Sequence, residues 1–281
     1  MKHVKSKVIL LLSIAVLSCT ERIDVKLDES YTRLVVEGSI TTDTLKHKVL
    51  LSTTSDYYFN KPPVMVKGAG VTISDGTTTE VLLEESPGIY STDSLFAGVA
   101  GRTYTLNVDL ETPIGGFKDY KASSTLLPVA RLDSISLAFH LSWGPGGIWE
   151  VKSYLLDPPT QDYYRILISR NSTLLTDTLY EWYVTDDIFF NGNYTNGAGI
   201  GYLVQDYHDN TVSPGDTITA EVNGIGKDYA SFIWDAQSEI WGSNPLFSGP
   251  SANIKGNINN GAIGFFAAYS VSRARAIVPS K

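Results

Sequence analysis

The chain has 281 residues, a formal net charge of −8 at pH 7 and a sequence pI near 5.0. An acidic chain without a block of Lys or Arg is a poor partner for nucleic acid or an anionic membrane face, because nothing would offset the repulsion from phosphate groups. A single cysteine excludes an internal disulfide, so stability has to come from core burial. The 16 Tyr, 5 Trp and 24 Gly, against only 2 Met, favour β structure.

Residues 1–18 have the three parts of an export signal. A positive head comes first, then the apolar run 8–17, and then the small residue Ser18. The run is shorter than the roughly 20 apolar residues that a membrane-spanning helix needs, and it fits the apolar region of a secretory signal peptide. The positive head consists of Lys2, Lys5 and Lys7.

The four residues Val16-Leu17-Ser18-Cys19 resemble a bacterial lipobox, in which the signal peptide is cut before the cysteine and the thiol is acylated. Two or more acyl chains give stable membrane anchoring. The alternative is an ordinary signal peptide with an incidental cysteine. We expect Cys19 to be a lipid anchor, followed by a polar tether over residues 20–30. Removal of residues 1–18 with their three lysines would change the net charge from −8 to −11.

Short alternating apolar segments fill residues 31–127. Their length, their spacing and the turn signals between them predict an N-terminal β-sandwich. Asp75-Gly76 lies between two such segments and predicts a hairpin, because glycine accepts a positive φ. The segments are RLVVEGSI, HKVLLSTT, AGVTISDG, TEVLLEE, GIYSTDSL and RTYTLNVDL.

A proline breaks the pattern in LLPVARLDS, and we place a domain boundary there, so that residues 128–281 form a second β-rich domain. Its strand-like segments are separated by longer loops. One segment differs, because its apolar residues recur at helical spacing and it ends at Gly242 and Pro245. It predicts a single amphipathic helix near residues 228–242. The chain is therefore expected to be mainly all-β with one helix.

Three blocks of the sequence are distinctive, namely LVVEGSIT, GAGVTISDG…PGIYSTDSLFAGVAGRTYTLNV and the late block WGSNPLFSGPSANIKGNINNGAIGFFAAYSVSRARAIV. With these blocks the chain resembles a family of Bacteroidota outer-membrane lipoproteins known as DUF4249, a domain of unknown function. The middle portion also resembles Ig-like or transthyretin-like β modules. The resemblance implies an outer-membrane location, on the surface or on the periplasmic face, in the company of TonB-dependent transporters. It supplies no catalytic residue.

No arrangement in the sequence points to an enzyme or to a cofactor. The histidines of the mature chain, His47, His140 and His208, are not spaced as zinc ligands, and the mature chain has no Gly-x-Ser-x-Gly elbow. The segment with Asp206 and Asp209 could offer oxygen ligands to calcium, but Asx residues also form turns. We expect no metal or catalytic site. Asp186-Asp187 is expected to be a solvated strand end.

Aromatic residues are the main hint of binding. Exposed aromatic rings on loops can stack on sugars or anchor a partner protein. The alternative is that they cover the ends of a sandwich. The candidates are Trp143 and Trp149 around GPGG at 144–147, Tyr57 and Tyr58 before a proline pair, and Tyr194 in an Asn/Gly-rich loop.

Gly261 and Gly264 are expected to serve the fold, by letting a last strand begin tightly after Asn259-Asn260. For function, the sequence favours a non-catalytic accessory or binding subunit of a TonB-dependent transporter or envelope complex, held to the outer membrane by its lipid. A stand-alone surface lipoprotein that binds glycans or peptides is the alternative.

Overall fold

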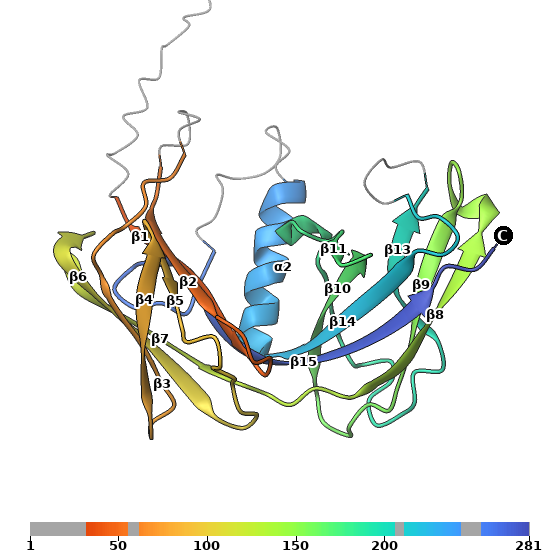
Figure 1. Ribbon diagram of the computed structural model, residues 1–281, viewed down its shortest axis with the longest axis horizontal. Coiled ribbons are helices and arrows are strands. Elements are labelled where there is room, and N and C mark those ends of the chain that lie inside the picture. Colours follow the sequence, from red (N-terminus) through yellow and green to blue (C-terminus); the bar gives the residue numbers. More distant parts are fainter. Residues whose placement is uncertain (1–31, 56–61, 206–210, 243–253, 281) are drawn as a thin grey trace, which may run out of the picture. The chain divides into compact units, whose positions relative to one another are not determined.

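A computed structural model describes residues 32–55, 62–205, 211–242 and 254–280. Within them it has strands in two sheets, one long helix and two short 3-10 helices (Figure 1). The strands of the N-terminal half are β1 (Leu34–Thr41), β2 (Lys48–Thr53), β3 (Gly70–Ser74), β4 (Thr79–Ser86), β5 (Ile89–Ser91), β6 (Thr103–Ile114) and β7 (Phe117–Thr125).

The remaining elements follow after residue 127. The strands are β8 (Leu132–His140), β9 (Ile148–Leu155), β10 (Tyr163–Arg170), β11 (Thr173–Leu174), β12 (Tyr183–Asp186), β13 (Ala198–Val204), β14 (Thr217–Ile225) and β15 (Ile263–Ile277). The helices are η1 (Leu141–Trp143), η2 (Leu179–Glu181) and α2 (Lys227–Gly242). Among the described residues, no helix is both long enough and apolar enough to cross a membrane.

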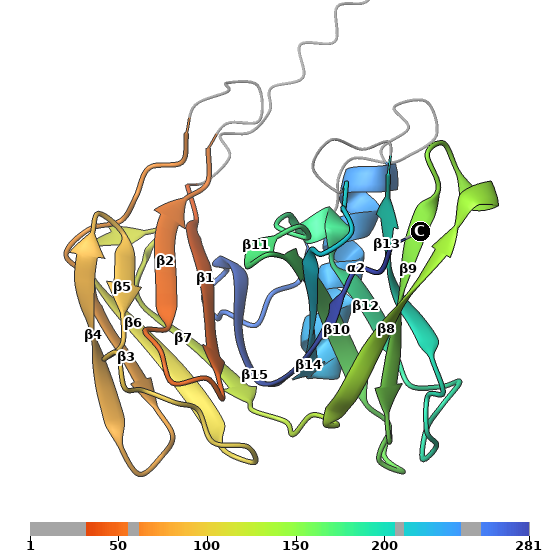
Figure 2. The ribbon, with the colours of Figure 1, turned by 45° about the vertical axis from the view of Figure 1, so that its right-hand side comes forward.

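The larger sheet contains 12 strands in the order β11-β10-β14-β15-β1-β2-β5-β4-β3-β6-β7, with β12 paired to β10. All neighbours are antiparallel except β1 and β15, which run parallel from Val35–Ile263 to Thr41–Tyr269. The strands β1, β2, β5 and β4 follow one another side by side in Figure 2. The pairing of β1 with β15 joins the N-terminal half of the chain to its C-terminal strand.

Apolar residues at every second position explain why these strands bury one face. In β6 the side chains of Tyr104, Leu106, Val108 and Leu110 are buried, and most of the residues between them are exposed. They belong to a first core with residues from β1, β2, β3, β4 and β7.

The path of strands bends around this core until β7 meets β15. The backbone N–H of Ala268 in β15 donates to Ser124 Oγ in β7 at 2.9 Å. Asn257 also connects the two strands, because its Nδ2 donates to the carbonyls of Ser123 and Phe266 and its Oδ1 accepts from Phe266 N at 2.9 Å. Side chains thus supply hydrogen bonds where β7 and β15 lack a regular ladder.

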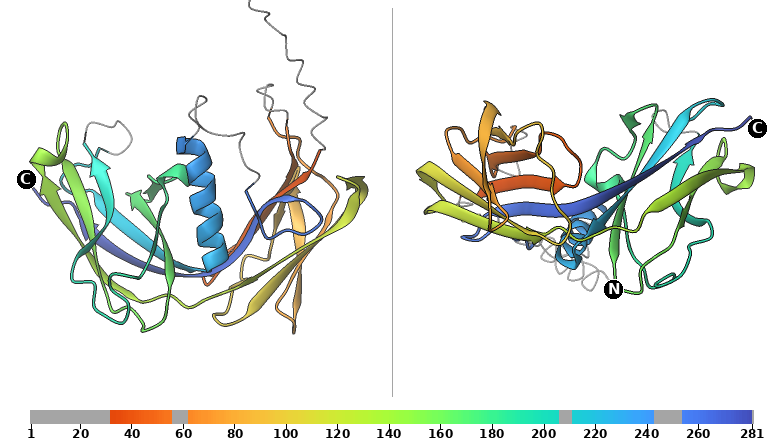
Figure 3. Two further views of the ribbon diagram at one scale, coloured as in Figure 1. Left: turned by 180° about the vertical axis from the view of Figure 1, so that it is seen from behind. Right: turned by 60° about the horizontal axis from the view of Figure 1, so that its bottom comes forward.

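The smaller sheet has the order β13-β9-β8 and covers a second core. This core combines Trp149 and Val151 of β9 with Ile166 and Ile168 of β10 and with Ala220 of β14. A third cluster lies under α2, where Ala230 and Ile233 are fully buried against Phe265 of β15. Figure 3 shows β15 as one long strand running through both halves of this structure. It contributes residues to all three clusters.

The prediction of a mainly β chain with one long helix is confirmed. Each strand-like segment quoted above for residues 31–127 contains a strand, Asp75-Gly76 forms the turn between β3 and β4, and the helix lies over residues 227–242. Strands β7 and β9 were not predicted. The sequence of β7, FKDYKASST, has few large apolar residues, and β9 begins directly after GPGG, which is typical of a loop. Since β15 pairs with both halves, the division at residue 127 stays a prediction.

The start of β15 requires glycine, as the sequence suggested. Gly264 has a φ of +101°, and a Cβ added there would lie 2.0 Å from the carbonyl oxygen of Val36. Gly261 also has a positive φ, of +72°, but a Cβ there would meet nothing within 4 Å. Gly264 therefore combines a left-handed backbone with direct contact to β1.

We expect Gly264→Ala to lower the free energy of unfolding by about 3 kcal/mol or more, because a left-handed backbone and overpacking each cost ~1–3 kcal/mol. The matched control Gly261→Ala keeps only the backbone cost, about 1 kcal/mol. Urea denaturation of both variants measures the difference. Equal losses would show that the approach of β15 to β1 is not tight.

Candidate functional site

A groove of about 790 Å³ opens over the region where β15 meets β1 and β14. Side chains from β1, β2, β10, β14, β15 and α2 line it, together with the segments around η2 and between β1 and β2. Two of its apolar residues, Leu45 and Leu174, are 41% and 40% exposed. The groove thus brings together residues from both halves of the chain, which no local sequence pattern could reveal.

Arg165 of β10 is the central charged residue of the groove. It is 4% exposed, and its guanidinium carbon lies 4.6 Å from the ring centroids of both Trp182 and Tyr269. Its Nε and Nη2 donate to Asn223 Oδ1 at 3.0 and 2.8 Å, and its Nη1 donates to Tyr229 Oη at 3.3 Å. Aromatic faces and amide oxygen therefore replace the water that this cation loses on burial.

The electrostatics of Arg165 keep it charged. Burial alone would lower its pKa, but interactions with Tyr269, Tyr229 and Glu221 outweigh burial and raise the pKa. The same cation lies beside Tyr229, whose pKa is nevertheless raised to about 12 because burial disfavours the phenolate. The groove therefore holds the positive charge of Arg165 next to the neutral hydroxyl of Tyr229.

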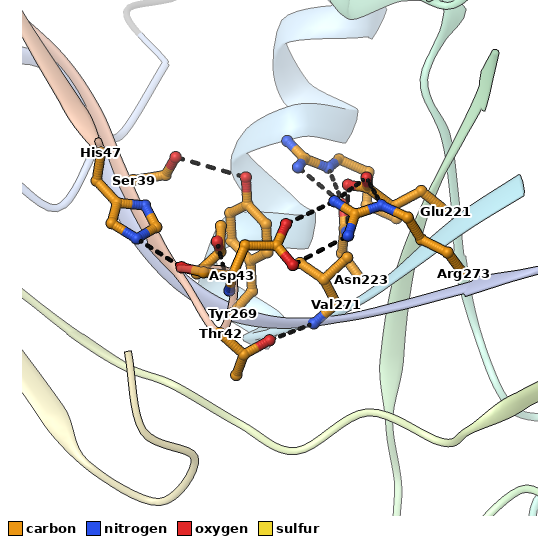
Figure 4. A network of polar contacts seen from close by, with 11 residues as sticks. Ser39, Thr42, Asp43, His47, Glu221, Asn223, Tyr269, Val271 and Arg273 are labelled. Carbon is orange, nitrogen blue, oxygen red and sulfur yellow. Dashed lines mark hydrogen bonds and ion pairs between the residues drawn. The ribbon is translucent and has the colours of Figure 1, made fainter. Parts of the chain in front are cut away.

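A chain of polar contacts connects Arg165 to the loop between β1 and β2. Figure 4 shows the part of this chain that runs from Asn223 through Glu221 and Arg273 to Asp43. Asn223 Nδ2 donates to Glu221 Oε1 at 2.9 Å, and Arg273 Nε donates to Glu221 Oε2 at 2.7 Å. Arg273 then binds both carboxylate oxygens of Asp43, at 2.9 and 2.6 Å. The hydrogen bonds that Arg273 donates to Asp43 lower the pKa of Asp43, and the same bonds raise the pKa of Arg273.

His47 lies at the end of this chain. It is 3% exposed, its Nε2 lies 3.2 Å from the carbonyl oxygen of Asp43, and its ring meets that of Phe96 edge to face. Burial is the main reason why the pKa of His47 is lowered. A neutral His47 with its proton on Nε2 can donate a hydrogen bond to the backbone carbonyl oxygen of Asp43, and this bond holds the loop between β1 and β2 in place.

A second group of charged residues lies between β9, β10 and β12. One carboxylate oxygen each from Asp157, Asp162 and Asp187 can lie within 4.8 Å of the others, and Asp157 and Asp187 are 1% exposed. Tyr164 Oη donates to Asp157, and Asp162 N donates to Asp187. Burial raises the pKa of Asp157. Such oxygens suit Ca²⁺, although three carboxylates supply only part of the 6–8 ligands that it takes.

The expectation that Asp187 is a solvated strand end is wrong. Its side chain accepts the N–H of Asp162 at 3.0 Å, and its carbonyl accepts the N–H groups of Phe190 and Asn191 at 2.8 Å. These bonds hold the side chain of Asp187 in a buried position, whereas Asp186 next to it is half-buried.

The two tryptophans near GPGG have different environments. Trp143 is 50% exposed in η1, and its ring stacks on His140 with centroids 3.6 Å apart. The expectation that Trp149 is exposed on a loop is wrong, because it is 2% exposed in β9 and its ring lies 5.0 Å from that of Phe139. The inward face of β9 places Trp149 in the second core, where no surface ligand could reach it.

The other predicted residues divide between described and undescribed parts of the chain. Tyr194 is 39% exposed and donates a hydrogen bond to Asp133 at 3.3 Å, so it lies at the surface but away from the residues that line the groove. Three predictions lie outside the described residues, namely the anchor Cys19, the aromatic pair Tyr57 and Tyr58, and the loop with Asp206 and Asp209.

The groove residues were missed because they are far apart in the sequence. Arg165 did carry a signal, since it is a lone cation inside the apolar run YYRILIS. A charged residue in the middle of a buried strand needs partners. Asp43, Glu221 and Arg273 gave no such signal, because Asp43 stands among polar residues, and Glu221 and Arg273 fit the ordinary alternation of apolar and polar residues in a strand.

The stability of the protein should depend on pH through His47. Because the folded pKa lies below the ordinary value of about 6.5, the unfolded chain takes up a proton first as the pH falls. We expect the free energy of unfolding to decrease below pH ~6.5, with a slope of up to about 1.4 kcal/mol per pH unit from this group. In His47→Gln that slope should be smaller, as urea denaturation between pH 8 and 5 can measure. Parallel curves for the two proteins would contradict the assignment.

Comparison with known proteins places the chain in a family. No curated protein matches the sequence. The family model DUF4249, described as a domain of unknown function, matches residues 20–275, which include every strand except the last two residues of β15. The match covers most of the chain, so the protein belongs to the DUF4249 family.

Proposed function

We propose that this protein is a non-catalytic binding subunit, lipid-anchored at the outer membrane, that works with a TonB-dependent transporter or a related envelope complex. The lipobox pattern ending at Cys19 supports the anchor. The groove supports the binding role, and it is the single observation that carries the proposal. Its partner is a segment of the transporter that lies along the groove.

The groove has the properties of a protein-binding surface. Partly exposed leucines from two different segments, Leu45 and Leu174, can be covered by a partner, and burial of the exposed part of one such side chain contributes roughly 1 kcal/mol, about 40% of what full burial gives. The charges of Arg165, Glu221 and Arg273 are already held by neighbours before binding. A partner would therefore not have to order them, which lowers the entropic cost of association.

A stand-alone surface lipoprotein that binds glycans or peptides is the second candidate function. The specific observation in its favour is Trp143, which is half exposed and held flat against the ring of His140. Trp143 lies in η1, which connects β8 and β9 of the smaller sheet, and it does not line the groove.

The anchor can be tested by metabolic labelling with an alkyne fatty acid in the native host. We expect the parent chain to incorporate the label and Cys19→Ala to incorporate none, because the thiol is the attachment point. Equal labelling of both proteins would remove Cys19 from the proposal, and the absence of label from the parent would indicate an ordinary signal peptide.

The binding role can be tested by isolating the tagged protein from its own outer membrane in mild detergent and identifying the co-purifying proteins by mass spectrometry. We expect a stoichiometric transporter with the parent chain. Leu45→Glu with Leu174→Glu should reduce its recovery at least about tenfold, since charges there oppose burial by a partner. The matched control is Leu83→Glu, a residue that is 72% exposed on β4 and does not line the groove.

Recovery of the parent chain alone would overturn the transporter association. If the groove variant and the Leu83→Glu control recover the transporter equally well, the association stands but the groove is not its binding site.

A further inference from the structure

The outward face of the smaller sheet carries a cluster of aromatic and charged side chains, which we call the Trp143 platform. Glu150 of β9 lies in register with Ala138 of β8 and with Tyr202 of β13, so these three positions form one row across the sheet. The platform consists of His140, Trp143, Glu150, Lys152 and Tyr202.

Trp143 forms the aromatic part of the platform. Its ring and that of His140 are 3° from parallel, and Tyr202 lies 6.2 Å from it at an angle of 50°. Half of Trp143 and 53% of Tyr202 remain exposed. Two aromatic surfaces that lie at an angle beside each other thus face outward at the end of the sheet.

Glu150 supplies a fixed carboxylate next to these rings. It is 8% exposed, and its Oε2 lies 2.9 Å from His140 Nε2 and 3.4 Å from Lys152 Nζ. Both contacts use Oε2. The other oxygen, Oε1, lies on the side of Gly199, where an added Cβ would be 2.7 Å from it and 2.9 Å from Tyr202 Oη. Because Gly199 has no side chain, Glu150 Oε1 and Tyr202 Oη can both lie close to its backbone.

The support beneath the platform is rigid. The opposite face of the same strands carries Trp149 and Val151, which are buried in the second core. Gly147, with a φ of +85°, packs so closely that an added Cβ would lie 2.3 Å from the ring of Phe139. This tight turn fixes the return of the chain after Trp143.

We propose that the Trp143 platform binds a pyranose unit of a glycan. The apolar face of a sugar ring would pack on Trp143 and Tyr202, while its hydroxyls would accept from Lys152 and donate to Glu150. Flat aromatic surface combined with a few fixed polar groups is the composition of small-ligand sites, and hydrogen bonds to charged groups are the stronger ones. The carboxylate of Glu150 and the net charge of −8 oppose a nucleic acid.

This inference rests on the second candidate function and gives it a ligand class and named residues. It is independent of the groove and of the transporter. Trp143→Ala should therefore leave the recovery of a transporter unchanged, and the Leu45→Glu/Leu174→Glu variant should leave glycan binding unchanged.

The test uses the full chain in a detergent without a sugar headgroup, so that the detergent does not compete. Cellohexaose, xylohexaose, mannohexaose, maltohexaose, laminarihexaose and chitohexaose are titrated by calorimetry, with tryptophan fluorescence as a second readout. We expect at least one of them to bind with a Kd of about 1 mM or tighter. Trp143→Ala should weaken that binding at least about tenfold, because aromatic residues dominate such contacts.

Two further variants separate binding from folding. Glu150→Gln keeps the shape of the side chain but loses its charge, and it should weaken binding about fivefold because charge-assisted hydrogen bonds are roughly twice as strong as neutral ones. Phe117→Ala is the control, since Phe117 is also an aromatic residue with 46% exposure but lies on β7. It should bind as the parent does, and all variants should keep the thermal midpoint of the parent within a few degrees.

Three outcomes would overturn the proposal. The first is that none of the six oligosaccharides binds at about 10 mM. The second is that Trp143→Ala and Glu150→Gln bind them as tightly as the parent. The third is that a proline-rich dodecapeptide, which also stacks on aromatic rings, binds through Trp143 while the sugars do not.

Discussion

Backbone hydrogen bonds between β1 and β15 connect the beginning of the described chain to its end, and the other features of the structure are built around them. Gly264 allows the two strands to approach, and β15 then continues to pair with β14. The residues of β1, β14 and β15 that line the groove share one sheet only because of this pairing. A groove lined by residues from both halves is thus a direct result of one parallel strand pair.

The polar contacts across the groove reinforce that arrangement. Arg273 extends from β15 to Asp43 in the β1–β2 loop, and Glu221 and Asn223 carry the chain of contacts to Arg165. Burial of a cation is costly, and here two aromatic rings and an amide oxygen offset that cost. Because these charges are already held in place by neighbours, a partner would not have to order them, which supports the proposed binding role.

Local patterns predicted much of the fold but little of the site. Alternation identified strands such as β6, and helical spacing identified α2, since both signals depend on neighbouring residues. Trp149 shows the limit of this approach, because a tryptophan beside GPGG looks like a loop residue until the partner strands of β9 are known. The groove depends on contacts between β1 and β15, and single-sequence patterns carry no information about such distant pairs.

The pairing of the first strand with the last also sets an order for folding. Ser39 and Tyr269, which touch in the folded protein, are 230 residues apart in the chain. During synthesis or export β1 can pair with β2 early, but its other edge has no partner until the C-terminal segment has emerged. Contacts of such long range slow folding and leave a strand edge open meanwhile. Truncations from the C-terminus would therefore remove β15 and leave one edge of β1 unpaired. The first core would also lose Phe266 and Ala268.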